Sequence, residues 1–322
     1  MKIFYTFILC IGVLSATITS IDIRPQHPQK DAAHIKILDQ KELIFHTIKG
    51  IKFSEISDLA YYSKKKKLFM VSDEGKLFTF KAEFGNKITC LEAVDAVELV
   101  KKSGKPFKSW RHDSEGMTLD GRGRLLISFE GKAKIGYFHK NSKKQGRLIR
   151  KYKLPRKLRN RKNYRSGNKS LEALAWHPKY GILTAAEWPL KNSDIKYQTI
   201  YALNGREWHF QAEKEAKSAI SAIEVMDDGN LLVLERSFSG FLNPFVITLK
   251  KVYLSKCKHG LCKSQVLAKL NSHKGWSVDN FEGLAKVGDH RYLMVSDDND
   301  NFFQKTLLIY FEVLDQGPIH NR

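Results

Sequence analysis

Short apolar runs bounded by turns recur along the chain and predict pairs of β-strands. No long stretch shows the 3.6-residue period of an amphipathic helix. The runs are Leu68–Val71, Leu125–Phe129, Ile182–Ala186, Leu231–Leu234 and Tyr292–Val295. Polar turns precede several of them, at residues 64–67, 120–123 and 227–230, and Asp-Gly or Gly-rich clusters favour a chain reversal. The pattern therefore predicts a series of antiparallel hairpins.

The hairpins form a repeat. A step of Ser or Glu, a small residue, an apolar residue and an Ala-like residue begins at positions 57, 115, 172, 221 and 282. A period of roughly 50–60 residues built from short strands is typical of an all-β propeller. About 300 residues at about 56 per unit predict five or six blades. Because closure protects sheet edges, residues Glu42–Ile48 and Thr306–Leu314 are expected to pair and close the ring.

An acidic residue follows each step after 14 to 16 residues, near the end of the second strand. In an antiparallel hairpin this position and the step lie at the same end, so the repeat predicts an acidic mouth of the central channel. The expected carboxylates are Asp73, Glu115, Glu130, Glu172, Glu187, Glu235, Glu282, Asp297 and Asp298. The alternative is that each acid simply ends a strand in solvent. That alternative is the simpler one for any single acid, but five occurrences weaken it.

The N-terminus has the pattern of a secretory signal peptide. A lysine precedes the apolar run Ile3–Leu14, and small residues near 16–20 offer a cleavage site. The run is too short for a membrane span, and no other segment approaches that length. We therefore expect residues 1–20 to be a leader, residues 21–322 to form one domain, and the protein to be periplasmic or secreted.

Three cysteines remain after this leader. Cys257 and Cys262 flank a short turn, and export to an oxidising compartment favours a disulfide between them. A metal site that includes His259 is the weaker alternative because the sequence shows no fourth ligand. Cys90 is expected to be buried and free.

Positive charge dominates the chain, with a formal net charge of +21. Residues 140–169 hold fourteen Lys or Arg residues and no acid. Such a block is able to bind an anionic surface, and the alternative is a solvated face of a basic protein. Export and the lack of a nucleic-acid-binding motif argue against nucleic acid as a partner.

Several common catalytic motifs are absent from the sequence. It contains no Gly-x-Ser-x-Gly elbow, no His-Glu-x-x-His zinc motif, no phosphate-binding loop and no dinucleotide fingerprint. A conventional α/β-hydrolase esterase is therefore not expected.

The order and spacing of five segments resemble the phytase-like family described as "esterase-like activity of phytase". The segments are residues 113–116, 168–175, 234–238, 280–285 and 295–299, and the resemblance covers roughly residues 45–315. It implies an exported bacterial propeller that hydrolyses phosphoric or carboxylic esters. Ser57 and Ser221 depart from the glutamate of the other steps, and Asp58 replaces the small residue. These departures put in doubt a metal site that needs an acid from every blade.

The first functional hypothesis is a metal-assisted hydrolase of phosphoric esters. Crowded carboxylates suit Ca²⁺, which takes six to eight oxygen ligands and activates water. The expected catalytic residues are Glu115, Glu172, Glu282 and His112. The expected metal ligands are Asp73, Glu130, Glu187, Glu235, Asp297 and Asp298. An anionic substrate such as a phosphate ester would bind Arg111, Lys169 and Arg236.

Two alternatives remain open at this stage. A non-catalytic propeller would bind an anionic ligand or a partner protein, with the Glu and Arg residues forming structural networks and block 140–169 serving as the working surface. A carboxylic esterase would use Ser57 or Ser221 as nucleophile, although neither has an evident histidine partner.

Overall fold

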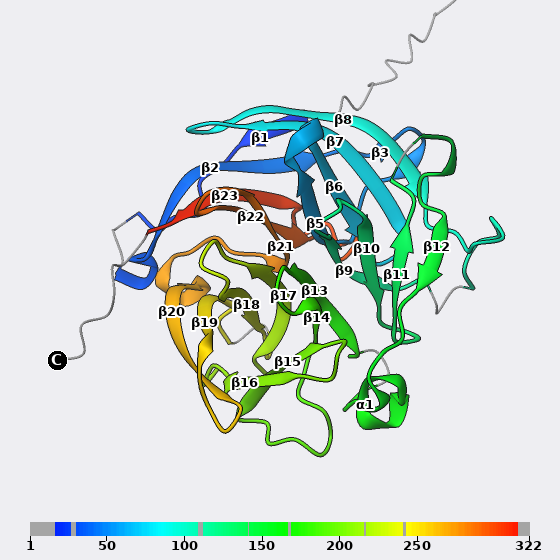
Figure 1. Cartoon of the computed structure of the whole chain (residues 1–322). Helices are drawn as coiled ribbons and strands as arrows, with labels where there is room; N and C mark the ends of the chain where they lie inside the picture. The colour runs from blue at the N-terminus through cyan, green and yellow to red at the C-terminus, as the bar shows by residue number, and fades with distance from the viewer. Residues whose placement is uncertain are drawn as a thin grey trace, which may run out of the picture.

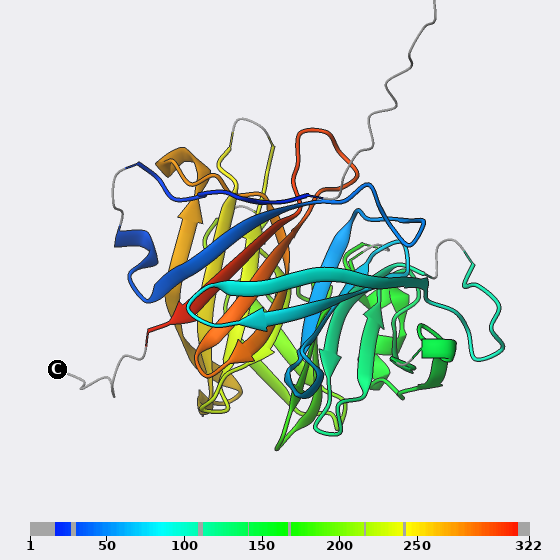
Figure 2. The same ribbon diagram turned by 90° about the horizontal axis from the view of Figure 1, so that it is seen from above.

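The computed structural model describes residues 17–26, 30–108, 112–140, 142–166, 169–215, 217–240 and 243–314. These residues form four-stranded antiparallel units arranged radially around one axis (Figure 1). Seen from above in Figure 2, the units pack side by side into a disc-like domain. The described part of the chain is therefore a β-propeller.

Five units, or blades, make up the propeller. Blade 1 contains β5 (Ile56–Tyr62), β6 (Lys67–Ser72), β7 (Lys76–Phe84) and β8 (Ile88–Glu98). Blade 2 contains β9 (Ser114–Leu119), β10 (Leu125–Phe129), β11 (Lys134–Phe138) and β12 (Leu148–Lys151). Blade 3 contains β13 (Leu171–His177), β14 (Gly181–Ala186), β15 (Tyr197–Ala202) and β16 (Glu207–Gln211). Blade 4 contains β17 (Ala219–Val225), β18 (Leu231–Ser237), β19 (Val246–Lys258) and β20 (Leu261–Asn271).

Both ends of the described chain build blade 5. It contains β21 (Asn280–Gly288), β22 (Arg291–Asp297), β23 (Leu307–Val313) and the N-terminal strand β2 (Ile35–Ile44), with β1 (Thr17–Ser20) added at its edge. β2 pairs with β23 from Ile35↔Val313 to Glu42↔Leu307. The expected closure by the two ends is thus confirmed, but of the expected segment Glu42–Ile48 only Glu42 pairs with β23, and the pairing strand lies earlier, at Ile35–Glu42.

The ring closes at its centre as well. Each innermost strand, β5, β9, β13, β17 and β21, contacts the next, and β21 contacts β5. The sequence left five or six blades open, and the described chain has five. Blades 3 and 4 are also linked at their outer edge, where His209 of β16 bridges Leu261 of β20 in parallel.

A separate hydrophobic cluster fills the interface between each pair of neighbouring blades. Successive side chains of a strand point to opposite faces, so the middle strands feed two clusters at once. In β6, Leu68 and Met70 pack toward blade 5, whereas Phe69 and Val71 pack toward blade 2. This two-sided burial explains why the second strand of each hairpin is almost continuously apolar.

Other segments lie outside the blades. β3 (Thr47–Ile48) and β4 (Ile51–Lys52) form a small hairpin before blade 1. The short α1 (Arg156–Arg159) lies in the basic block, where buried Leu154, Leu158 and Tyr164 pack between blades 2 and 3. Most of the basic side chains around them are exposed, so this block is a solvated, anchored face of the propeller.

The termini and cysteines match part of the sequence expectations. Residues 1–16 of the expected leader lie outside the described residues, and Thr17–Ser20 belong to β1. Cys257 and Cys262 form the expected disulfide. Cys90 is free but only half-buried, because its strand β8 is the outer strand of its blade. No helix in the described part of the chain has the length and apolar character needed to span a membrane.

The inner strands approach so closely in blades 2 and 5 that glycine is required at Gly116 and Gly283. A Cβ added to Gly116 would lie 2.6 Å from the carbonyl oxygen of Glu172 and 2.6 Å from the amide of Leu174. A Cβ added to Gly283 would meet Val295, Leu59 and the backbone of Asp58 at 2.6–2.8 Å. Backbone of the neighbouring blade thus occupies the space that a side chain would need.

We expect Gly116→Ala to lower the free energy of unfolding by about 1–3 kcal/mol, because the ring must widen to admit the methyl group. Urea unfolding followed by circular dichroism measures this loss. Gly85→Ala is the matched control, because its Cβ would meet nothing closer than Thr89 at 3.5 Å. Equal stability of the two variants would contradict the close approach of β9 and β13.

Candidate functional site

A β-bulge interrupts the first hairpin of every blade at the same place. In blade 1 the pairing passes from Ile56↔Ser72 to Asp58↔Val71, which leaves Ser57 without a partner. Blades 2 to 5 show the same irregularity. The bulges fall at the five step residues of the repeat, Ser57, Glu115, Glu172, Ser221 and Glu282. A bulge re-aims a side chain away from the regular alternation.

The strand pairing also defines a second ring of positions. In each blade one residue of the second strand pairs with the residue just before the bulge, and the ring position is the residue that follows it in sequence. The second-strand residues that form these pairs are Ser72, Phe129, Ala186, Glu235 and Ser296. The residues that follow them are Asp73, Glu130, Glu187, Arg236 and Asp297. The sequence-based assignment of Glu235 to this ring is therefore wrong by one residue. Arg236 occupies the position in blade 4.

Glu235 belongs to a different, buried network. Its Oε1 accepts a hydrogen bond from Lys250 Nζ at 2.7 Å. Its Oε2 accepts hydrogen bonds from the amide of Glu213 at 2.9 Å and the hydroxyl of Ser218 at 2.8 Å. Glu235 and Lys250 are each 1% exposed. Glu235 therefore anchors the loop between β16 and β17 instead of joining the other predicted metal ligands.

Five carboxylates of blades 2 and 3 converge at the inner ends of β9, β10, β13 and β14. They form two groups, Asp113–Glu115–Glu130 and Glu130–Glu172–Glu187, and one carboxylate oxygen from each member lies within 4.8 Å of the others. Glu172 is only 7% exposed, and no described residue donates a hydrogen bond to its carboxylate. Asp113 was missed as a ligand candidate, although its place beside Glu115 in the repeat was a usable signal.

Burial and mutual repulsion make these acids difficult to ionise. Burial, and then the charges of Glu172 and Glu130, raise the pKa of Glu115 well above its ordinary value. Burial and the charges of Glu187 and Glu130 do the same to the pKa of Glu172. Burial and the charge of Asp113 raise the pKa of Glu130 to about 8. A divalent cation among them would relieve this repulsion.

Two cations hold the edge of the cluster that faces blades 4 and 5. Arg236 Nη1 lies 2.7 Å from Glu282 Oε1, and its Nη2 lies 3.4 Å from Glu187 Oε1. Lys169 Nζ lies 2.5 Å from Glu187 Oε2. Asn280 accepts a hydrogen bond from Arg236 and donates one to Glu282 at 2.9 Å. Glu187 and Glu282 are therefore paired, whereas Glu115 and Glu172 have no hydrogen-bond donor among the described residues.

The remaining predicted residues lie near blade 1 or in its neighbouring loops. Burial and the charge of Glu55 raise the pKa of Asp73 to about 8, and burial and Glu282 raise the pKa of Asp297 to about 9. Asp73 Oδ1 is buried and has no hydrogen-bond partner among the described residues. Asp298 instead accepts hydrogen bonds from the amides of Glu55 and Asp300, so it braces a loop.

Of the two predicted residues that directly precede Asp113, the structure describes His112 but not Arg111. His112 packs over Gly75, and its buried Nδ1 likewise has no hydrogen-bond partner in the described parts of the chain. Arg111 lies outside the described residues.

Both serine steps, Ser57 and Ser221, are buried. The Ser221 hydroxyl is buried and donates to the carbonyl oxygens of Leu234 at 3.4 Å and Phe281 at 3.1 Å. Asp58, the other departure from the repeat, accepts hydrogen bonds from the amides of Met117 and Leu284 at 2.6 and 3.0 Å. Asp58 thus ties blade 1 to blades 2 and 5 across the centre of the ring.

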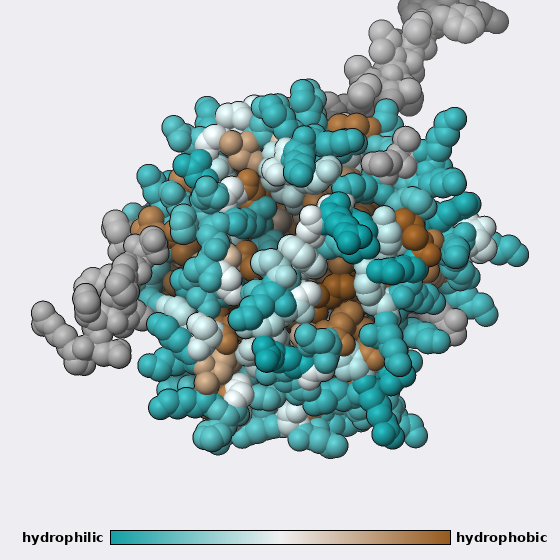
Figure 3. All heavy atoms as spheres, viewed as in Figure 1, coloured by the Kyte–Doolittle hydropathy of each residue, from teal (hydrophilic) through white to brown (hydrophobic). Residues whose placement is uncertain are grey.

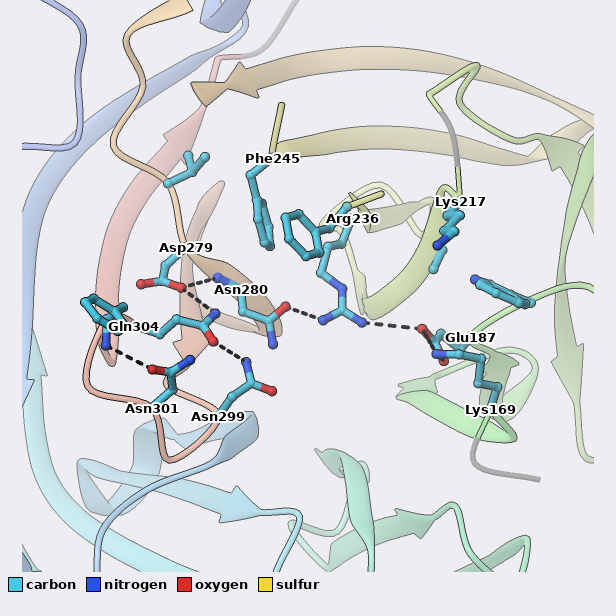
Figure 4. A pocket seen from close by; sticks show the side chains of 15 residues that line it. Lys169, Glu187, Lys217, Arg236, Phe245, Asp279, Asn280, Asn299, Asn301 and Gln304 are labelled. Carbon is cyan, nitrogen blue, oxygen red and sulfur yellow. Dashed lines mark hydrogen bonds and ion pairs between the residues drawn. The ribbon is translucent and has the colours of Figure 1, made fainter. Parts of the chain in front are cut away.

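A cavity of about 970 Å³ opens beside the carboxylates, between blades 3, 4 and 5. Figure 4 shows Arg236 and Phe245 next to each other, with Lys169, Lys217 and Glu187 on one side and Asn299, Asn301 and Gln304 on the other. Figure 3 shows one face of the disc covered mainly by hydrophilic residues, with hydrophobic residues visible between them. Glu187 belongs to both the carboxylate cluster and the cavity wall.

The residues present fit a Ca²⁺ ion. Carboxylate oxygens are the ligands that Ca²⁺ prefers, and several here lie within reach of one ion. Glu172 is nearly buried without a donor, which is costly for an ionised group that no cation or hydrogen bond compensates.

Comparisons with known proteins place the chain in a family. The model of the phytase-like family, described as "Esterase-like activity of phytase", matches residues 51–300. No curated protein sequence matches the chain significantly.

Similar solved structures are distant in sequence. The PQQ-bound aldose sugar dehydrogenase from Streptomyces coelicolor has 11% identity and a TM-score of 0.46, over 86% of this chain and 97% of that one. The virginiamycin B lyase from Staphylococcus aureus has 9% identity and a TM-score of 0.40, over 93% and 100%. The Pan2 WD40 domain from Neurospora crassa has 8% identity and a TM-score of 0.37, over 89% and 97%. At these values none of them bears on the activity of this chain.

The raised pKa values predict how the stability of the metal-free protein changes with pH. Glu130 and Asp73 have folded-state pKa values of about 8, above their ordinary values of 4.5 and 3.8, so folding favours their protonated forms. Their stabilising contribution is complete below the unfolded pKa and is lost as the pH rises through about 8. We expect the urea midpoint to fall between about pH 5 and pH 8, and to fall less in Glu130→Gln. A midpoint that stays constant or rises over this range would contradict the repulsion described above.

The corrected role of Glu235 gives a separate prediction. Glu235→Gln removes a negative charge that pairs with the buried ammonium group of Lys250, so we expect the free energy of unfolding to drop by about 3 kcal/mol. The stabilisation that Ca²⁺ gives to the folded variant should equal that of the wild type. Thermal unfolding with and without Ca²⁺ measures both quantities, and Glu92→Gln, at an acid whose side chain is 68% exposed, is the control. Loss of the Ca²⁺ effect in Glu235→Gln would restore Glu235 as a ligand.

Proposed function

Because this chain belongs to the phytase-like family, we propose that it is a metal-assisted hydrolase of phosphoric esters whose cofactor is Ca²⁺. The observation that carries the proposal is the position of Glu187. Its carboxylate belongs to a group of buried acids suited to a cation, and it also lines a cavity beside Arg236 and Lys169. A cation site and an anion-binding wall therefore share one side chain, which is the arrangement that phosphate ester hydrolysis needs.

The proposed cation would be held by the acids of blades 2 and 3. They are Asp113, Glu115, Glu130, Glu172 and Glu187. When bound, Ca²⁺ supplies charge neutralisation for the phosphoryl oxygens and lowers the pKa of a water molecule. Arg236 has five N–H donors, and its contacts with Glu187, Glu282 and Asn280 leave some of them for a phosphoryl oxygen. Lys169 and Arg236 thus orient the ester at the edge of the acidic cluster.

Glu115 is the proposed general base. Its carboxylate has no hydrogen-bond donor among the described residues, and beside a bound cation it would be ionised and able to accept a proton. It accepts a proton from water while the water oxygen bonds to phosphorus and the ester P–O bond breaks, and the leaving oxygen then takes a proton from Glu115 or from solvent to give the free alcohol. Glu282 acts indirectly, because its ion pair with Arg236 fixes the guanidinium. His112 and Asp73 lie near the blade 1 side of the mouth, and each has one buried atom without a hydrogen-bond partner among the described residues.

One observation favours the alternative of a non-catalytic binding protein. The pairs Lys169–Glu187, Arg236–Glu187 and Arg236–Glu282 form a continuous chain that joins blades 3, 4 and 5. Such a network fixes the blade register whether or not chemistry occurs. In this alternative the cavity binds an anionic ligand and releases it unchanged, and the basic block is a second surface for anionic partners.

The proposed place of action is the periplasm or the extracellular space. The N-terminal run of the sequence has the pattern of a signal peptide, and a disulfide joins Cys257 and Cys262. Cleavage at Ala16 would keep β1 in the mature protein. Mass spectrometry of the exported protein identifies its N-terminus.

Glu172→Gln and Glu115→Gln test the hydrolase. Each keeps the shape of the side chain but removes a charge needed to hold the cation or to accept a proton. We expect Ca²⁺-dependent release of phosphate from p-nitrophenyl phosphate to fall at least about 100-fold in each variant. Glu92→Gln, at a surface acid, should match the wild type. Wild-type turnover in both mouth variants, or turnover that chelators do not affect, would exclude the proposed mechanism.

A further inference from the structure

The cavity beside the carboxylates has an aromatic wall that phosphate binding does not explain. Its lining includes the side chains of Trp188, Phe238, Phe245, Val278 and Phe303. The rings of Phe238 and Phe245 stack with centroids 5.2 Å apart. Phe303 is 87% exposed at the cavity rim. Large aromatic side chains exposed around a cavity typically mark a ligand-binding surface.

Two loops supply the phenylalanine residues of this wall. The loop between β18 and β19 supplies Phe238 and Phe245, and the loop between β22 and β23 supplies Phe303. Figure 2 shows both loops projecting next to each other from the same face of the disc. The second loop turns through Asn299 and Asp300, both with a φ of 48°. It is held in place by Asp298, which accepts hydrogen bonds from Glu55 and Asp300.

The cationic groups line the cavity next to this aromatic wall. Lys169 and Arg236 lie there beside Glu187, and Lys217 is carried by the β16–β17 loop that Glu235 anchors (Figure 4). No described acid forms an ion pair with Lys217, whereas Lys169 and Arg236 are partly neutralised by Glu187 and Glu282. Lys217 is therefore the cation of this group that no described acid neutralises, and with Lys169 and Arg236 it could contact one phosphoryl group.

From this arrangement of aromatic and cationic side chains we infer that the site takes a phosphoric monoester of an aromatic alcohol. The ester binds with its phosphoryl group at Arg236 and its ring against Phe245 and Phe303. The inference rests on the proposed hydrolase function and specifies its substrate class. A polyphosphorylated sugar alcohol such as inositol hexakisphosphate fits this cavity poorly. It offers no apolar face to the aromatic wall, and most of its phosphates would lack a cation.

An unsatisfied donor in the wall gives independent support. Trp188 lines the cavity, and its buried Nε1–H has no hydrogen-bond partner among the described residues. Lys169 Nζ lies 4.9 Å from the centroid of the Trp188 ring, which holds the indole next to the cationic end. Because a buried N–H without a partner is costly, a ligand oxygen near Lys169 would be a favourable partner once the indole turns Nε1 toward the cavity.

Two non-hydrolysable anions separate the contribution of the aromatic ring to the binding affinity from that of the phosphoryl group. Phenylphosphonate and methylphosphonate carry the same anionic group and differ in the ring. We expect phenylphosphonate to bind the mature, Ca²⁺-loaded protein at least about tenfold more tightly in calorimetric titrations, because only its ring buries apolar surface. Methylphosphonate should bind Phe303→Ala as it binds the wild type, and phenylphosphonate should bind this variant about three- to tenfold more weakly.

Phe302→Ala is the matched control. Phe302 adjoins Phe303 and is 95% exposed, but it does not line the cavity, so its loss should leave both affinities unchanged. Equal affinities of the two phosphonates for the wild type, or equal effects of the two Phe variants, would overturn the aromatic subsite. Either result leaves the hydrolase proposal intact if p-nitrophenyl phosphate is still hydrolysed in a Ca²⁺-dependent manner. Selective phenylphosphonate binding without any hydrolysis would instead support the subsite and refute the hydrolase.

Discussion

The close approach of five strands around one axis is the constraint on which the rest of this structure depends. Five blades leave little space at the centre, so the inner strands pack backbone to backbone where Gly116 and Gly283 lie. The side chain that precedes each small residue has no room in a regular strand. The β-bulge present in every blade provides that room and turns this side chain out of the regular alternation. A packing requirement therefore positions the functional side chains.

The charges at the mouth follow from the same geometry. Three of the five bulges carry a glutamate, and four of the five positions in the second ring carry an acid. Together they would crowd negative charge into one small region. The chain limits this crowding in three ways. Ser57 and Ser221 replace two of the glutamates, and Arg236 replaces one of the adjoining acids. The remaining charge is concentrated in blades 2 and 3, which is where the carboxylates are most poorly compensated.

This uneven distribution of charge also gives the site an acidic side and a side lined by cations and amides. The acids of blades 2 and 3 face the cations and amides of blades 4 and 5, with Glu187 between them. Buried networks around Glu235 and Asp298 hold the loops that carry Lys217 and Phe303, although neither acid is part of the mouth. The loops thus determine what binds, and the rigid ring determines where charge is stabilised.

The sequence was sufficient to predict the fold class, the hairpins, the pairing that closes the ring and most of the acidic mouth. These features depend on local periodicity and on turns, which a single sequence records directly. The error at Glu235 arose because an acid was expected in every blade. The spacing from 115 to 130, 172 to 187 and 282 to 297 is 15 residues each, and the same 15 residues counted from 221 lead to Arg236, which the hydrogen-bonded register identifies as the member of the ring.

Other features could not be predicted from spacing at all. Asp58 breaks the repeat in sequence, yet it links three blades through backbone amides that are far apart in the chain. The aromatic wall combines residues from two loops that belong to different repeats. Tertiary packing alone brings such residues together, so no local pattern reports them.

Calorimetric titration of the metal-stripped, mature protein with Ca²⁺, in two buffers with different ionisation enthalpies, tests the central claim most directly. Carboxylates that are protonated in the empty site must release protons when a cation binds. The account predicts saturable binding whose apparent heat depends on the buffer, and a raised melting temperature of the Ca²⁺-bound protein. No binding heat and no change in melting temperature would mean that the acidic mouth is a structural feature and not a cation site.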